Sequence, residues 1–207
     1  MKILSALRGK QHTYTIATDD GRETPVDKTV WKHSGLSVGT EITDEKWQAL
    51  LELSATHRAR EKALYYLSLR DYGQNELTKK LCTAGVEREL ARQTTARLAE
   101  SGLIDDTRYA AMLARDMSVR KLYPKRRVAM ALAEKGFGSD IVATIISELP
   151  EEEEQQALEL LRKKRYNTSG EPKLREKALG MLARYGFSYA VARRAVALRE
   201  AEWNDEE

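Results

Sequence analysis

The sequence predicts a mainly α-helical protein, built from tandem three-helix repeats behind a small N-terminal β-hairpin module. Apolar residues at helical spacing fill the chain from about residue 57 onward, whereas β-branched and aromatic residues dominate a short stretch near its start. A block of the form Leu-x-x-x-Gly-apolar also recurs about every fifty residues, with its glycines at Gly85, Gly136 and Gly186. Such a period is typical of arrays in which each unit buries an apolar face against its neighbours.

The N-terminal module, which we place at residues 1–56, is predicted from two strands and one helix. Residues 13–18 have the composition of a strand, residues 19–22 that of a turn, and residues 23–26 that of a returning strand, which Pro25 restricts to a sheet edge. After a loop at residues 35–40, we expect Asp44 to cap a helix that begins near Glu45 and carries Trp47. An isolated hairpin is only marginally stable, so we expect it to dock on this helix or on a partner.

Glycine and proline divide the rest of the chain into three repeats of helix, loop, helix, glycine turn and helix. In the first repeat, a helix ends near residue 71, Asn75 opens the next, and a third spans about 87–101. We place the repeats at residues 57–102, 103–150 and 151–200, followed by an acidic tail at 201–207.

In the second repeat, Asp105 or Asp106 is expected to cap a helix that carries Tyr109 and Met112 among its apolar residues. Further helices are expected at residues 125–134 and 140–149. In the third repeat, a loop at residues 167–172 separates the first helix from the second.

Composition excludes several classes of function. The chain has 207 residues, of which 42% are hydrophobic, a net charge of +3 and one cysteine. A single cysteine excludes an internal disulfide and argues against structural zinc, and Cys82 lies in a helical apolar pattern typical of a core. His12, His33 and His57 lack metal-ligand spacing, and no phosphate-binding loop or nucleophilic triad is evident. We therefore expect no enzyme activity, cofactor or metal. No apolar run is long enough for a secretory signal or a membrane span, which favours a cytoplasmic location.

Positive charge is concentrated in the second and third repeats. Between residues 155 and 199 there are eleven Lys and Arg against three acidic residues, and between 108 and 147 there are eight against three. Two clusters stand out, one around Pro124 and one in the first helix of the third repeat, and both can bind phosphates or acidic protein surfaces. Because successive helical residues point about 100° apart, we expect two or three residues of each cluster to bind and the rest to be solvated. The candidate contact residues are Arg120, Lys121, Lys125, Arg126, Arg127, Arg162, Lys163, Lys164 and Arg165.

Three segments resemble the RecX family of regulatory proteins. They are residues 63–68 (Ala-Leu-Tyr-Tyr-Leu-Ser) followed by Leu77 and Leu81, residues 102–110 (Gly-Leu-Ile-Asp-Asp-Thr-Arg-Tyr-Ala) and residues 124–136. The second segment is the most specific, and the arrangement with the hairpin first is similar to the longer members of the family. The resemblance covers nearly the whole chain and is strongest over residues 60–150.

The resemblance implies an elongated, curved array of repeats that lies in the helical groove of the RecA–DNA filament. RecX proteins modulate, and usually inhibit, the ATP hydrolysis and strand exchange of this recombinase in DNA repair and the SOS response, and they have no catalytic residues of their own. The implied partners are the RecA filament and, weakly and without sequence preference, single- and double-stranded DNA. We expect a monomer that does not bind membranes, and we expect charge reversal at Arg126 and Arg127 to weaken filament binding.

Two other functions remain open from the residues alone. The first is an autonomous, nonspecific DNA-binding protein made of helical repeats. Reading of duplex sequence is disfavoured, because the third helix of the second repeat is largely apolar rather than rich in Arg, Asn or Gln. The second is a helical scaffold for an unrelated acidic protein.

Overall fold

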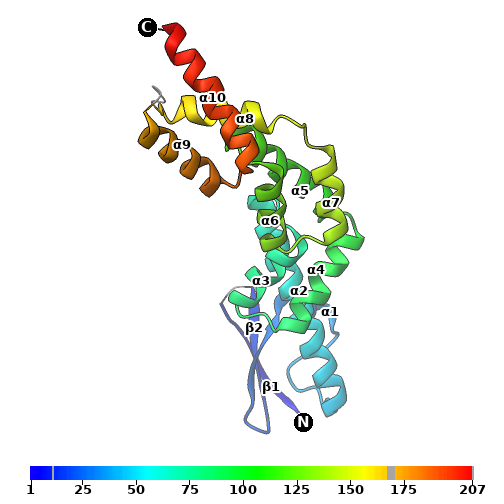
Figure 1. The fold of residues 1–207 in the computed structure, drawn as a ribbon. Coiled ribbons are helices and arrows are strands. Elements are labelled where there is room, and N and C mark those ends of the chain that lie inside the picture. The colour runs from blue at the N-terminus through cyan, green and yellow to red at the C-terminus, as the bar shows by residue number, and fades with distance from the viewer. Residues whose placement is uncertain (11, 167–170, 207) are drawn as a thin grey trace. The chain divides into compact units, whose positions relative to one another are not determined.

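The computed structural model describes residues 1–10, 12–166 and 171–206, and it confirms the mainly helical class with a small N-terminal sheet (Figure 1). The chain divides into two compact units, Met1–Ile104 and Asp105–Glu207. The first unit contains β1 (Ile3–Arg8), β2 (Thr13–Thr18), β3 (Glu23–Asp27), α1 (Lys28–His33), α2 (Asp44–Leu69), α3 (Gln74–Thr83) and α4 (Arg88–Glu100). The second contains α5 (Asp106–Arg115), the π-helical turn η1 (Asp116–Arg120), α6 (Lys125–Lys135), α7 (Ser139–Glu148), α8 (Glu153–Lys163), α9 (Pro172–Tyr185) and α10 (Tyr189–Glu206).

The sheet is antiparallel in the order β1-β2-β3 and has one strand more than the predicted hairpin. The predicted strands are confirmed as β2 and β3, which pair with Ile16 opposite Thr24. The additional strand, β1, pairs with β2 through Ala6 opposite Ile16. Local composition does not reveal β1, because its six residues become a strand only through pairing with residues further along the chain. The third strand supplies the stability that an isolated hairpin lacks.

The sheet docks on α2, as expected for a hairpin that is unstable alone. Asp27 is buried at the end of β3, where its backbone N–H donates to Ser54 Oγ of α2 at 2.7 Å. Its carboxylate Oδ1 accepts from the backbone N–H groups of Thr29 at 2.8 Å and Val30 at 3.1 Å, so it caps α1. The same oxygen lies 3.2 Å from Nδ1 of His57 on α2. The shared core comprises Ile3, Ile16, Val26, Val30, Trp31, Ile42, Trp47 and Leu50.

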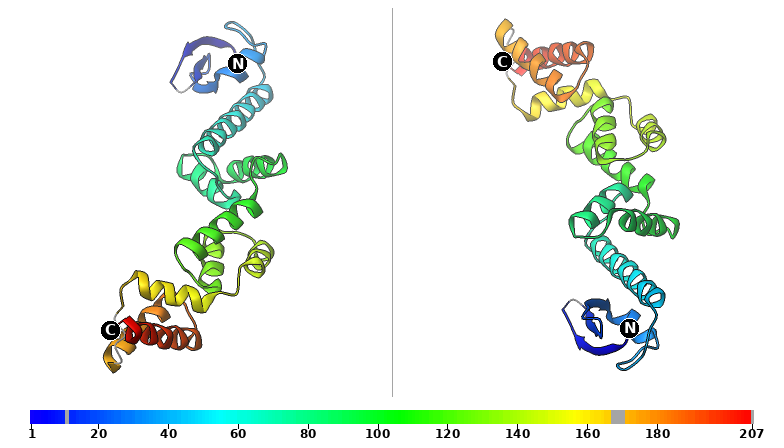
Figure 2. Two further views of the ribbon diagram at one scale, coloured as in Figure 1. Left: turned by 90° about the horizontal axis from the view of Figure 1, so that it is seen from above. Right: turned by 90° about the horizontal axis from the view of Figure 1, so that it is seen from below.

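Helix α2 runs without a break from the N-terminal module into the first repeat, so the expected boundary at 56/57 lies inside one helix (Figure 2). Its first half packs under the sheet, and its second half, through Ala63, joins the core of α3 and α4. The prediction that Asp44 caps this helix is wrong. Thr43 is the cap, since its side chain accepts from the backbone N–H of Lys46 at 3.3 Å, and Asp44 is the first helical residue.

The helices of the first repeat follow the prediction to within a residue or two. Helix α3 begins at Gln74 rather than Asn75, and α4 begins after Glu87, whose carboxylate accepts from two backbone N–H groups at its start. Gly85 follows α3 with φ of +86°. This left-handed conformation ends a helix and is readily adopted by glycine, which accounts for the recurring glycine in the sequence.

The second unit contains the second and third repeats. Of the two aspartates expected to cap α5, Asp105 is the cap, since its carboxylate accepts from the backbone N–H of Arg108 at 2.8 Å. Helices α6 and α9 both end at a left-handed glycine, Gly136 and Gly186. The turn η1 after α5 is not predicted by the sequence. The core of α5, α6 and α7 is built around Tyr109, Ala110, Val128, Leu132, Phe137 and Ile145.

In the third repeat, α8 and α9 both pack against α10 around a second core. The predicted loop at 167–172 lies largely outside the described residues, and α9 begins at Pro172. Helix α10 continues through residue 201, where the acidic tail was expected, to Glu206. Among the described helices, none is long and apolar enough to cross a membrane.

Candidate macromolecular interface

The nine predicted contact residues all lie in the second unit, in three short segments. Arg120 and Lys121 stand at the end of η1, Lys125 to Arg127 form the first turn of α6, and the run from Arg162 to Arg165 spans the end of α8. The expectation that this run lies on one helix is wrong. Helix α8 ends at Lys163, Lys164 is its C-cap, and Arg165 has φ of +51°, so helical spacing does not govern the last two side chains.

The end of η1 packs against α8, which brings two of these segments together. Lys163 Nζ donates to the backbone carbonyl of Arg120 at 3.4 Å, and Gln156 Nε2 donates to Ser118 Oγ at 2.8 Å. Leu122 is 3% exposed within the core of the third repeat. Its φ of +56° costs about 1–2 kcal/mol for a residue with a Cβ, so burial of this side chain must offset the strain.

The resulting basic surface, which we call the junction patch, consists of Arg120, Lys121, Lys163, Lys164 and Arg165. All five residues are exposed, and the side chain of Arg120 is 81% exposed. One carboxylate, that of Asp116, lies 2.9 Å from Arg120 and 3.8 Å from Lys121, so the patch keeps a clear positive excess. Arg126 is also exposed, at the start of α6.

The other three predicted residues, Lys125, Arg127 and Arg162, make contacts within the protein. The sequence instead predicts that the members of each cluster that do not bind a partner are solvated. Lys125 is 18% exposed and its Nζ lies 2.5 Å from Glu151. The acidic residues that follow α7 also contact α6, because Glu153 Oε1 accepts a hydrogen bond from the backbone N–H of Lys125 at 3.1 Å. A carboxylate at this position satisfies an unpaired donor of the first turn and complements the helix dipole.

Arg127 connects α6 to the end of α9. Its guanidinium Cζ lies 3.8 Å from the ring centroid of Tyr123 and 5.0 Å from that of Tyr185, and Nη1 donates to the backbone carbonyl of Tyr185 at 3.2 Å. Its stem packs beside Gly186, where a Cβ would lie 3.3 Å from the Cβ of Arg127. We call this set of interactions the Arg127 contact.

Arg162 is engaged by α10. Its Nε donates to Glu202 Oε2 at 3.0 Å, and this hydrogen bond is the main cause that lowers the pKa of Glu202 below its ordinary value of 4.5. The partly buried Glu202 also accepts from Arg199 Nη1 at 3.1 Å, so a single carboxylate neutralises much of the charge of both arginines.

An apolar groove of about 630 Å³ borders the junction patch between α5, η1 and α7. Met112 and Val119 are more than half exposed in it. Its charged lining residues are two arginines and two carboxylates, Arg115, Arg120, Asp116 and Glu148. Sequence reasoning missed this groove. The spacing of Met112 groups it with the apolar residues of α5, and a π-helical turn such as the one that presents Val119 has no recognisable local pattern.

The described residues provide no group of three His, Cys, Asp or Glu side chains that could hold a metal ion. The described histidines are all in the first unit, where His57 faces Asp27. The second unit presents exposed cations beside an apolar groove.

Two segments of the chain match known protein families. Residues 105–144 match the profile described as the second three-helix domain of RecX, and residues 151–196 match that of the third. The regulatory protein RecX of Stenotrophomonas maltophilia strain K279a is 35% identical over 137 residues, which cover 65% of this chain and 83% of that protein. The regulatory protein RecX of Listeria welshimeri is 25% identical and is covered to 79% by an alignment that spans all of this chain.

Solved structures agree with these sequence matches. A crystal structure of a regulatory protein RecX superposes with a TM-score of 0.68 at 26% identity and covers 94% of this chain and 98% of its own. The crystal structure of RecX from Lactobacillus salivarius has a TM-score of 0.61 and covers 71% of this chain and 97% of its own. At 20% identity, this second structure supports the fold alone.

Proposed function

The chain belongs to the RecX family of regulatory proteins, and we propose that it regulates homologous recombination by binding the RecA–DNA filament in its groove. The binding is expected to inhibit the ATP hydrolysis and strand exchange of the filament. The observation that carries this proposal is the junction patch, where five exposed cations stand beside a groove with exposed Met112 and Val119.

A filament groove presents protein surface and phosphate charge at close range, so its ligand needs apolar and cationic contacts side by side. Phosphates favour Lys and Arg that are not already neutralised, and Lys164 and Arg165 are both exposed. The neighbouring groove offers apolar side chains to a protein surface, where buried apolar contacts supply affinity and charge supplies orientation.

The direct test is single-stranded-DNA-dependent ATP hydrolysis by RecA, titrated with this protein at moderate salt. Fluorescence anisotropy on the same DNA without RecA is the parallel measurement. Suppression of hydrolysis well below the concentration that coats the DNA supports a filament regulator. Tight binding to DNA with no effect on hydrolysis would favour an autonomous nonspecific DNA-binding protein. No effect on hydrolysis and no binding to DNA would contradict both functions.

A pair of charge reversals locates the contact. Lys121→Glu with Lys164→Glu changes two exposed residues of the junction patch, and Lys79→Glu with Arg88→Glu is a matched control on exposed residues of the first unit. The patch variant is expected to inhibit at least about tenfold more weakly than the control. If the lost contacts are to phosphates of single strands, the slope of log affinity against log salt should fall by about 1.4. Equal inhibition by the two variants would exclude the junction patch from the contact.

A further inference from the structure

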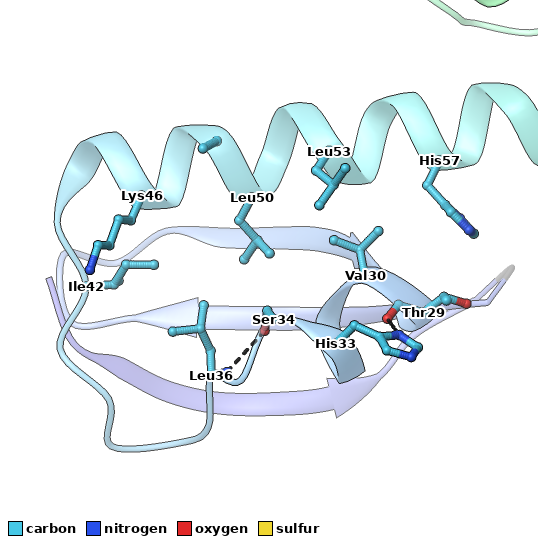
Figure 3. A pocket seen from close by; sticks show the side chains of 11 residues that line it. Thr29, Val30, His33, Ser34, Leu36, Ile42, Lys46, Leu50, Leu53 and His57 are labelled. Atoms are coloured by element: carbon cyan, nitrogen blue, oxygen red, sulfur yellow. Dashed lines mark hydrogen bonds between the residues drawn. The ribbon is translucent and has the colours of Figure 1, made fainter.

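A second groove lies in the first unit, between α2 and the segment that contains α1 and the loop after it (Figure 3). It has a volume of about 650 Å³. Its apolar floor is formed by Val30, Ile42 and Leu50, which are buried, and Leu36 and Leu53 stand beside them. This groove belongs to the N-terminal module and takes no part in the junction patch.

The groove exists because α1 is too short to cover the whole apolar stripe of α2. Residues Lys46, Leu50, Leu53 and His57 are spaced by three or four positions and share one face of α2. Leu50 is 7% exposed, whereas Leu53, one turn further along, is 58% exposed. From Lys46 to His57 the stripe extends about 16 Å, the length of three helical turns.

The ionisable side chains that line the groove are all basic. Lys46 stands near the start of α2, and His33 and His57 stand near the opposite end. His33 Nδ1 donates to the backbone carbonyl of Thr29 at 2.7 Å when it carries the proton, which leaves Nε2 for a ligand.

Two carboxylates close to the groove already accept hydrogen bonds. Asp27, beside His57, is 5% exposed and serves as the cap of α1. Glu52 of α2, next to Leu53 in the chain, accepts from Gln48 Nε2 at 3.2 Å. The described lining therefore combines an apolar floor with the ammonium group of Lys46 at one end and two imidazoles at the other.

We propose that this groove binds an amphipathic, acidic segment of a protein partner. Two or three helical turns of such a segment place apolar side chains on Leu50 and Leu53 and carboxylates near Lys46 and the two histidines. Helix-in-groove binding of this kind relies on apolar anchors at positions i, i+3, i+4 and i+7, and the charges set the orientation. This site does not depend on the proposed action on RecA filaments.

The test uses the full-length protein and a fluorescein-labelled peptide of about two heptads, with leucine on one face and glutamate elsewhere. A matched peptide carries lysine in place of glutamate. In an anisotropy titration, the acidic peptide is expected to bind at least about tenfold more tightly than the basic one, because Lys46 attracts carboxylates and repels ammonium groups. Absence of binding by the acidic peptide, or equal binding of both peptides, would overturn the proposal.

Leu53→Glu places a carboxylate in the groove and is expected to weaken binding of the acidic peptide at least about tenfold, because the charge is desolvated against leucine side chains. Leu69→Glu is the matched control, since Leu69 is 62% exposed on the same helix but outside the groove lining. Leu53→Ala removes apolar area without adding charge and should weaken binding less. Unchanged binding by Leu53→Glu, with a circular dichroism spectrum like that of the parent protein, refutes the site.

Two other occupants are distinguished by the same variants. Sedimentation velocity without peptide tests a second copy of the chain, and a dimer that Leu53→Glu abolishes would mean that the groove serves self-association. Vesicles of phosphatidylcholine and phosphatidylglycerol test a lipid surface, and vesicle binding that depends on Leu53 without peptide binding would likewise contradict the protein partner. These measurements can be interpreted even if the protein has no effect on ATP hydrolysis by RecA.

Discussion

Replacing Arg127 with alanine is expected to destabilise the second unit, whereas the same change at neighbouring Arg126 is not. Arg127 stacks on Tyr123 with its Cζ 3.8 Å from the ring centroid, lies 5.0 Å from that of Tyr185, and donates to the Tyr185 carbonyl at 3.2 Å. Arg126 is exposed. Each substitution removes one positive charge at the same end of α6, so long-range electrostatics cancel in the comparison.

The size of the effect follows from these contacts. A partly desolvated cation–π interaction contributes about 1 kcal/mol, and the more distant ring contributes about half of that. The hydrogen bond from a charged donor to the carbonyl contributes about 1.5 kcal/mol. The sum is about 3 kcal/mol, and partial replacement by water gives an expected loss of about 2–3 kcal/mol in the free energy of unfolding. Arg126→Ala should stay within about 0.5 kcal/mol of the parent protein.

The assay is urea denaturation followed by circular dichroism, with hydrogen exchange to locate the change. Arg127→Ala is expected to lower the amide protection at the end of α9, where the repeats meet. Arg127→Lys keeps the charge but lacks the planar guanidinium, so it should recover less than half of the loss. Equal stability of the alanine variants at 126 and 127 would refute the structural role of the Arg127 contact.

This difference changes how the basic cluster should be tested. Charge reversal at both Arg126 and Arg127, which the sequence suggests as a test of filament binding, mixes a lost surface contact with a lost structural one. Arg126→Glu alone changes the surface and spares the contact between the repeats. The effect of Arg126→Glu on the inhibition of ATP hydrolysis therefore reports binding to the filament.

Three further predictions concern local features. Asp27→Ala removes the α1 cap and the carboxylate that faces His57 of α2. It should lower the stability of the first unit by about 1–3 kcal/mol in denaturation followed by tryptophan fluorescence, whereas Asp27→Asn, which keeps a capping oxygen, should cost less. Gly186→Ala and Gly85→Ala both introduce strain of about 1–2 kcal/mol at positive φ, but only the Cβ at position 186 would lie close to a neighbouring carbon, at 3.3 Å. The unfolding temperature of Gly186→Ala should therefore fall further than that of Gly85→Ala, and equal shifts would contradict this reasoning. The folded-state pKa of Glu202 is lowered, so its ion pairs stabilise the protein above the ordinary value of 4.5, and this stabilisation is lost as the pH falls through the folded-state pKa. In denaturation experiments, the advantage of the parent protein over Glu202→Gln at pH 6 should therefore shrink progressively as the pH falls below 4.5.

The sequence by itself determined the features of this protein that depend on neighbouring residues. The recurring glycines mark helix ends, because Gly85, Gly136 and Gly186 all adopt left-handed backbone conformations. The hairpin of β2 and β3 and an aspartate cap at residue 105 or 106 follow from strand composition, turn chemistry and capping, which act over a few residues. Composition also indicated where positive charge gathers.

Tertiary structure alone decided which of those charges are exposed. Lys125 pairs with Glu151, Arg127 contacts Tyr185, and Arg162 is engaged by residue 202, partners that are 26, 58 and 40 positions away along the chain. Strand β1, the continuity of α2 and the two apolar grooves depend in the same way on packing between distant segments. The local sequence pattern predicts helices and strands, because propensity and capping act within a few residues. It does not predict which charges and apolar side chains are exposed, because an ion pair or a groove depends on distances that exist only after distant segments have packed.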